Sequence, residues 1–142
     1  MFGIAPEANI DRAESQHFAD LTRWASEEGF VDYLCPQIYF GFQNQLLPFS
    51  ATLSRWNGLS YADGVRLYVG LAVYKTGEAD KYAGEAGKSE WQNSSDILTR
   101  QLTECRQASR YCGVILYEYD ALFDPVSYTH LWFYSKKEHP YV

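Results

Sequence analysis

Four short apolar segments alternate with segments of helical periodicity along the chain. The apolar segments are "FGIA" (2–5), "VDYLCPQIYF" (31–40), "VRLYVGLAVY" (65–74) and "GVILYEY" (113–119). Each has the length of one strand, and most are nearly continuous apolar runs, which is typical of strands that are covered on both faces of a parallel sheet. The pattern therefore predicts a parallel sheet of four strands.

Helical patterns occupy the three intervals between these segments. Phe18, Leu21 and Ala25 recur at helical spacing, and Gly29 is the predicted end of that helix. A second, shorter helix is predicted within residues 48–58, where a proline precedes the helical segment and a glycine follows it.

The third helix is predicted to begin at Ser95 or Asp96 and to stop at Gly113. One face of this helix is expected to carry Leu98, Leu102, Cys105 and Cys112. The element order is then β-α-β-α-β-α-β, which defines an α/β fold. A unit of this size is either a small doubly wound domain or half of an eight-strand barrel, because a full barrel needs about 250 residues.

Polar and aromatic residues follow each predicted strand, in "PEAN", "PQIYFGFQNQ", "YKTG" and "YEYD". In α/β folds the carboxyl ends of the strands carry the binding site. The residues after the second strand are the richest in amides and aromatic rings, so this segment is predicted to form part of a binding rim.

Composition narrows the class of partner. The length of 142 residues fits one domain, and 46% hydrophobic and 21% charged residues are typical of a folded globular chain. The net charge of −6 argues against nucleic acid or an anionic membrane as partner and is compatible with a neutral sugar. No apolar stretch is long enough to span a membrane, and "MFGIAPEANIDR" lacks the features of a secretion signal.

Three cysteines are present, and no pair of them has metal-ligand spacing. Cys35 falls in an apolar strand, while Cys105 and Cys112 are too far apart on the predicted third helix to bridge. Buried free thiols are the expected state. No cofactor and no metal are predicted.

The strand-end motifs also carry a family resemblance. "FGIAPEANI", "VDYLCPQIYFGF", "RLYVGLAVYKTG" and "GVILYEYDALF" resemble, in this order, the C-terminal half of the family 10-like glycosyl hydrolases, which are bacterial TIM-barrel proteins. The resemblance covers residues 1–123 and implies the last four βα units of a (β/α)8 barrel. Nothing matches the Asp-rich "FDDY"-like motif that the family carries on an earlier strand.

The resemblance implies a function for the full-length protein, namely hydrolysis of O-glycosyl bonds in a bacterial cell-wall or other polysaccharide glycan. It also implies a secreted or cell-envelope location. A half-barrel would lack key carboxylates and would expose two sheet edges, so residues 1–142 alone are expected to be inactive and to self-associate through those edges. The alternatives are a non-catalytic carbohydrate-binding barrel and a small independent α/β domain with a non-sugar ligand.

Glycoside hydrolysis normally needs two carboxyl groups. The strand-end carboxylates are Glu7, Glu118 and Asp120, and Glu7 and Glu118 depart from the family's pattern. Alternation along the last strand predicts Leu116, Glu118 and Asp120 on one face, so Glu118 is the candidate acid or base. The alternative is a structural Glu118 paired with Lys75.

Five further side chains are candidates for substrate binding. Gln37 and Tyr39 are predicted to share a face and to offer an amide and a phenol to sugar hydroxyls, or else to pack within a rim. Lys75 is either an anion or carboxylate partner or a solvated lysine. Asn9 either binds substrate or caps a helix. Trp91 either stacks on a sugar ring or packs against the helix that follows it.

Residues 124–142 do not continue the α/β pattern. The segment "VSYTHL" (126–131) matches one reading frame of a transposase adapter used in DNA library preparation, which indicates a sequencing artefact. The alternative is a genuine C-terminal extension. Under the artefact interpretation, His130, Trp132, Phe133 and His139 are not read as a site.

Overall fold

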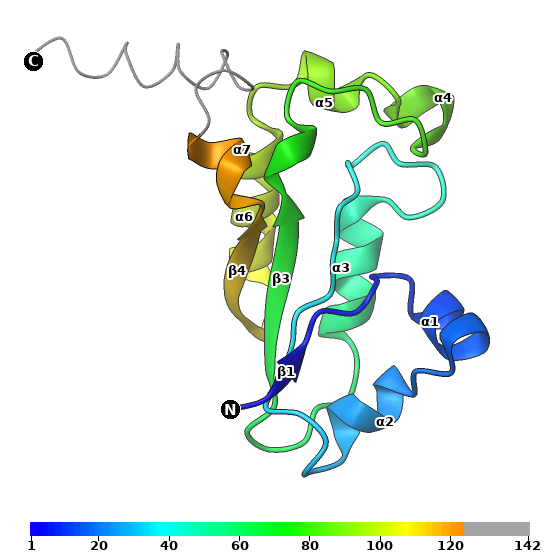
Figure 1. Cartoon of the computed structure of the whole chain (residues 1–142), viewed down its shortest axis with the longest axis vertical. Helices are drawn as coiled ribbons and strands as arrows, with labels where there is room; N and C mark the ends of the chain where they lie inside the picture. Colours follow the sequence, from blue (N-terminus) through cyan, green and yellow to red (C-terminus); the bar gives the residue numbers. More distant parts are fainter. Residues whose placement is uncertain (124–142) are drawn as a thin grey trace, which may run out of the picture.

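The computed structural model describes residues 1–123, in which four parallel strands form one sheet (Figure 1). The strands are hydrogen-bonded in chain order and comprise β1 (Gly3–Ile4), β2 (Tyr33–Leu34), β3 (Arg66–Ala72) and β4 (Tyr111–Tyr117). The predicted α/β class and the parallel sheet of four strands are therefore confirmed. The interpretation of residues 124–142 lies outside the described residues.

Helices lie between each pair of consecutive strands, and one more helix follows β4. They are α1 (Ile10–His17), α2 (Leu21–Ser26), α3 (Phe49–Asn57), the 3-10 helix η1 (Val73–Lys75), α4 (Gly84–Gly87), α5 (Glu90–Asn93), α6 (Ile97–Gln107) and α7 (Tyr119–Phe123). The helix predicted within residues 48–58 is confirmed, because α3 begins directly after the proline and ends directly before the glycine.

The first predicted helix is wrong in its boundaries, because the connection holds two helices. Phe18 ends α1 in a left-handed conformation (φ 53°), and its side chain is exposed rather than part of an apolar face. A second helix, α2, begins after Asp20, whose carboxylate accepts from the backbone N–H of Arg23 and so caps it. A local cap therefore prevails over the apolar spacing, and α2 ends at Ser26, before Gly29.

The third predicted helix is also too long. α6 begins after Asp96, as expected, but it ends at Gln107, where Ala108 turns into an extended conformation. Cys112 therefore lies in β4 and is exposed, which corrects its placement on the helix and as a buried thiol. The tyrosine and β-branched residues of this segment pair with β3 instead of continuing the helix.

The helices cover one face of β3. Leu67, Val69 and Leu71 point into a single core that α2, α3 and α6 share, while Tyr68 on the opposite face meets the ring of Tyr33 edge-on at 5.5 Å. In Figure 1, α6 lies behind β3 and β4. The expectation of a sheet with both faces covered by helices is thus corrected. One-sided cover is compatible with part of a TIM-barrel wall, whose helices form an outer ring.

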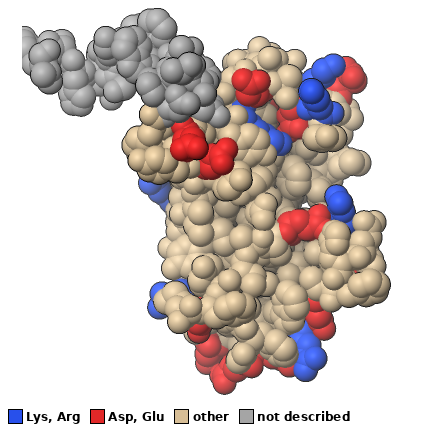
Figure 2. All heavy atoms as spheres, in the orientation of Figure 1, with Lys and Arg blue, Asp and Glu red and all other residues tan. Residues whose placement is uncertain are grey.

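The sheet edge at β4 is open within residues 1–123. Ile115, Leu116 and Tyr117 are 46%, 39% and 47% exposed, although they continue an apolar strand. In Figure 2, the part of the surface over β3 and β4 carries few charged side chains, and acidic and basic groups gather above it, below it and to its right. No helix of the described residues is long and apolar enough to cross a membrane.

The three thiols differ in environment, which gives a test of the fold. Burial raises the pKa of Cys35 to about 11 and that of Cys105 to about 12, so both stay protonated and shielded at pH 8. We expect a chromogenic thiol reagent to label one thiol per native chain rapidly and all three after unfolding. Cys112→Ser is expected to remove the rapid phase, and rapid labelling of a second thiol would contradict the fold.

Candidate functional site

A cleft of about 780 Å³ opens at the carboxyl ends of β1 and β2. Its lining comes from the segment after β1, from α1, from the segment after β2, from α3 and from the loop before α4. The polar and aromatic members are Glu7, Asn9, Asp11, Arg12, Gln37, Tyr39, Phe40, Asn44, Arg55 and Tyr82. The structure thus brings three of the predicted binding residues, Asn9, Gln37 and Tyr39, to one cleft.

Gln37 continues the sheet beyond β2. It forms parallel bridges to Glu7 on one side and to Gly70 on the other, and its Nε2 donates to the carbonyl oxygen of Ala5 at 2.7 Å. The preceding Pro36 is tolerated because its carbonyl still accepts from the N–H of Gly70 at 2.9 Å. The backbone of Gln37 is therefore held by the neighbouring segments on both sides, and its side-chain amide is held by the carbonyl oxygen of Ala5.

Tyr39 belongs to a cluster of three tyrosines at the strand ends. Its ring stacks on Tyr117 at 5.7 Å with an interplanar angle of 17°, and it meets Tyr74 edge-on at 6.1 Å. Burial raises the pKa of Tyr39 to about 12, so the phenol keeps its proton at neutral pH. It can then both donate and accept a hydrogen bond in the cleft.

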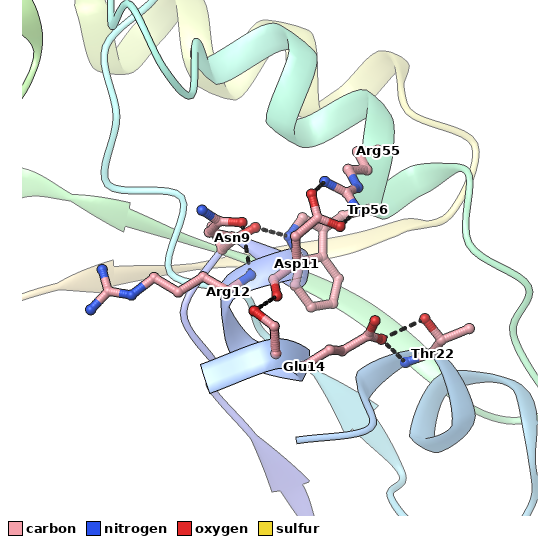
Figure 3. A network of polar contacts seen from close by, with 9 residues as sticks. Asn9, Asp11, Arg12, Glu14, Thr22, Arg55 and Trp56 are labelled. Carbon is pink, nitrogen blue, oxygen red and sulfur yellow. Dashed lines mark hydrogen bonds and ion pairs between the residues drawn. The ribbon is translucent and has the colours of Figure 1, made fainter. Parts of the chain in front are cut away.

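Two carboxylates line the cleft, and each lies beside an arginine. Glu7 Oε1 is 3.2 Å from His17 Nε2, and Glu7 Oε2 is 3.6 Å from Arg12 Nε. Figure 3 shows the second carboxylate, Asp11, facing the guanidinium of Arg55, whose Nη1 donates to Oδ2 at 2.6 Å. The hydrogen bonds from Arg55 lower the pKa of Asp11, which favours the ionised form.

Asn9 caps α1. Its side-chain oxygen accepts from the backbone N–H of Arg12 at 3.2 Å, and this contact is drawn in Figure 3. The capping role considered for this residue is thereby established. A contact between Asn9 and substrate stays a prediction.

Lys75 lies outside the cleft lining and has two polar partners. Its Nζ donates to the carbonyl oxygen of Tyr39 at 2.7 Å and to Asp80 Oδ2 at 2.8 Å. The side chains of Lys75 and Asp80 are both largely buried. The alternative in which Lys75 pairs with Glu118 is wrong, because Asp80 occupies that place. Lys75 ties the end of β3 to the segment after β2.

Glu118 and Trp91 are also not among the residues that line the cleft. β4 ends at Tyr117, so Glu118 is an exposed residue beyond the strand and Asp120 belongs to α7. The predicted common strand face of these residues is therefore wrong. Trp91 is 1% exposed and packs with Ala72 and Ile97 in a core beside α6, so its ring has no free face toward the cleft.

A set of buried polar side chains shapes the loop of residues 40–47, which forms one wall of the cleft. Glu90 is 5% exposed, and its carboxylate accepts from the N–H groups of Phe42 at 3.0 Å and Gln43 at 2.9 Å. Gln101 Nε2 donates to the Phe40 carbonyl at 2.9 Å. Sequence reasoning missed both residues, because each resembles an ordinary polar residue of a solvated helix.

Asn44 stabilises a turn within the same loop. Its Oδ1 accepts from the N–H groups of Leu46 at 3.1 Å and Leu47 at 2.9 Å, which is the local turn that asparagine favours. Gly41 completes the fit, because a Cβ there would lie 2.0 Å from Glu90 Oε2. The amides after β2 thus serve in part to build the wall.

Metal ligation has no support in the described part of the chain. Among residues 1–123, no three His, Cys, Asp or Glu side chains come together in a group that could hold a metal ion.

A parallel α/β sheet with a polar and aromatic cleft at its strand ends is an architecture that glycosidase-like barrels share. Residues 1–86 match the family model described as glycosyl hydrolase-like 10, so the chain belongs to the glycosyl hydrolase-like 10 family. Over 115 residues it is 30% identical to the proteins named Glycosyl hydrolase DigH from Escherichia coli (strain K12) and from Shigella flexneri. That alignment covers 80% of this chain and 25% of each relative, so the chain spans about a quarter of their length.

Removing the Glu90 carboxylate tests the loop. In Glu90→Ala the amides of Phe42 and Gln43 lose their acceptor, and each unpaired buried donor costs about 1–3 kcal/mol. We expect the free energy of unfolding to fall by about 2 kcal/mol or more, and hydrogen exchange at these two amides to accelerate. The exposed Glu85 of α4 provides the matched control, and Glu85→Ala should stay within about 0.5 kcal/mol of wild type. Unchanged exchange in Glu90→Ala would contradict the assignment.

Proposed function

We propose that this chain forms the C-terminal half of a (β/α)8 barrel that acts on a glycan, in the bacterial cell wall or in another polysaccharide. The observation that carries the proposal is the cleft at the strand ends of a glycosyl hydrolase-like protein, with Gln37 and Tyr39 on its surface. A secreted or cell-envelope location of the full-length protein belongs to the same proposal.

The proposed binding chemistry uses groups that match sugar hydroxyls. Gln37 Nε2 is already engaged by Ala5, so its Oε1 is the atom proposed to accept from a hydroxyl. The protonated phenol of Tyr39 supplies a second contact, and Asn9 a third beside the cap of α1. Lys75 is proposed to act by holding the strand ends rather than by touching sugar.

Catalysis would need two carboxyl groups, separated by about 5–5.5 Å for retention or about 6.5–9.5 Å for inversion. Glu118 was the candidate from the sequence, but Glu7 is the carboxylate that follows a strand and lines the cleft. We therefore propose Glu7 as this half's contribution, with the second carboxylate on strands that the 142 residues do not include. On this view the chain alone does not hydrolyse glycan.

A non-catalytic carbohydrate-binding barrel is the second candidate. The observation that favours it is that an arginine lies beside each carboxylate of the lining, Arg12 beside Glu7 and Arg55 beside Asp11, so that neither carboxylate is without a charged partner. The hydrogen bonds from Arg55 also lower the pKa of Asp11, which opposes a general-acid role for Asp11. Analysis of the products that the full-length protein releases from a polysaccharide separates the two candidates. Shortened glycan chains support the enzyme, and intact chains that remain bound support the binder.

Gln37→Ala tests the proposed binding surface in the 142-residue chain. Loss of one hydrogen bond is expected to weaken binding of an uncharged oligosaccharide by about 2- to 10-fold, measured by calorimetric titration. The control is Gln107→Ala, which removes an exposed amide on α6 outside the cleft lining. Equal affinities of wild type and Gln37→Ala, with the fold retained, would remove Gln37 from the site.

We also propose that the chain self-associates through its open sheet edges. β4 exposes apolar side chains on both faces, and β1 pairs only with β2 among the described strands. Beside β1, Phe2 and Ile4 line an apolar hollow together with Trp24 and Phe30. Unpaired parallel edges of this kind favour addition of further strands.

Sedimentation velocity tests this association. The wild-type chain of 16.3 kDa is expected to sediment as a dimer or larger species, and Leu116→Lys is expected to shift it toward monomer because the lysine charges the edge. Leu46→Lys, at a residue that is 85% exposed and away from the sheet edges, serves as the control. A wild-type monomer that melts cooperatively would instead favour a small independent domain.

A further inference from the structure

The mouth of the cleft carries an unusually exposed aromatic ring. Tyr82 is 88% exposed and belongs to the cleft lining, where Leu46, which is 85% exposed, also lies. The two residues belong to adjoining loops, because the N–H of Gln45 donates to the carbonyl oxygen of Ala83 at 2.9 Å. An apolar surface is thus presented to solvent at the entrance of a polar cleft.

The turn that carries Tyr82 is held from below by a buried ion pair. Asp80 accepts from Lys75 Nζ at 2.8 Å through one carboxylate oxygen and from the N–H of Tyr82 at 3.1 Å through the other. The Asp80 side chain is 3% exposed, and its backbone N–H donates to the carbonyl oxygen of Lys88 at 2.9 Å. The same carboxylate therefore fixes both the turn and the end of β3.

Gly84 allows this turn to pack closely against the neighbouring loop. Gly84 has a φ of 76°, and a Cβ at this position would lie 2.1 Å from Gln45 Oε1. Glycine adopts this backbone conformation without strain, and a larger residue would also have to displace the side chain of Gln45. The position of Tyr82 relative to the cleft is consequently set by packing, although its ring is free.

Single exposed aromatic rings are common on protein surfaces and need no function. Phe18 is an internal comparison, since it is also 88% exposed, but it ends α1 and lines no part of the cleft. Tyr82 differs from it in two ways, namely its place at a cleft mouth and the buried Lys75–Asp80 pair beneath it. Because burying an ion pair carries a desolvation cost, its placement here indicates a need for a fixed turn.

Charges within the cleft indicate what kind of sugar fits. The two acidic residues of the lining, Glu7 and Asp11, lie beside the two arginines, Arg12 and Arg55. This balance leaves little field to attract a strongly anionic or cationic sugar. An uncharged pyranose, which presents C–H groups on its ring face and hydroxyls at its edge, matches an aromatic mouth above a hydrogen-bonding floor.

We infer that Tyr82 is a stacking platform for an uncharged sugar ring at the mouth of the cleft, and that Lys75 and Asp80 are positioning residues for that platform. The inference rests on the proposed glycan function and assigns it a residue outside the predicted set. The hydroxyl of Tyr82 is not required, because the ring face makes the contact.

Titration of the 142-residue chain with chitotetraose, an uncharged tetrasaccharide of N-acetylglucosamine, tests the platform. Tyr82→Ala is expected to weaken binding by about 2- to 10-fold, while Tyr82→Phe keeps the wild-type affinity. Phe18→Ala is the control for loss of an equally exposed ring and should leave the affinity unchanged. A Tyr82→Phe variant as weak as Tyr82→Ala would overturn the stacking assignment.

A double-mutant cycle tests the positioning role. Asp80→Asn is expected to weaken binding, but the double variant with Tyr82→Ala should bind no more weakly than Tyr82→Ala alone, because both changes remove the same contact. Additive losses would show that Lys75 or Asp80 acts on the sugar independently and would overturn the positioning role. Circular dichroism on each variant checks that the fold is retained.

The outcomes separate this inference from the proposed function. If wild type binds neither chitotetraose nor cellotetraose, which is also uncharged, the glycan function fails and the platform fails with it. If wild type binds and Tyr82→Ala binds equally well, the platform alone is overturned and the glycan function stands.

Discussion

The backbone of residues 40–47 leaves the sheet and turns through a partly buried region, where its polar groups must find partners inside the protein. Glu90 accepts from two consecutive amides of the loop, Asn44 accepts from two more, and Gln101 donates to one carbonyl. Without these acceptors and donors the wall of the cleft would carry unpaired groups, each costing about 1–3 kcal/mol. The cleft therefore depends in part on Glu90 and Gln101, which are not among its lining residues.

This constraint explains why a buried strand is followed by so many amides and rings. Some of them build the wall: Asn44 forms a local turn, and the backbone N–H of Gln45 bonds to the neighbouring loop. Others face the cleft, because Gln37 and Tyr39 continue the direction of β2 toward its floor. Amides and aromatic rings after β2 thus have two roles. Those in the part of the chain that still continues β2 face the cleft, and those in the loop that follows build its wall.

Much of the fold could be predicted from local sequence, because its signals are local. Continuous apolar runs marked the strands, and the proline and glycine around α3 marked its ends. The break at Phe18 was missed because the cap by Asp20 outweighs an apolar spacing that suggests one continuous helix. Cys112 was misplaced because its helical spacing of seven residues from Cys105 carries no information on whether pairing with β3 is stronger.

The site was less predictable, since exposure and pairing are set by distant segments. The strand-end rule correctly placed Gln37 and Tyr39 in a cleft, because it depends only on chain direction in a parallel sheet. It could not tell Trp91, which is buried, from Tyr82, which is exposed. Both follow β3 in polar, glycine-containing sequence, and only the packing of α5 against Ala72 and Ile97 decides between them.

The exposed surface of β4 is consistent with the greater length of the relatives. Leu67, Val69 and Leu71 are buried beneath helices, whereas Ile115 and Leu116 on the next strand are exposed on the two opposite faces of β4. Exposure on both faces at an edge means that a neighbouring strand and a neighbouring helix are both absent there within residues 1–123. Further βα units would supply both at once, and the relatives are about four times as long as the segment they share with this chain.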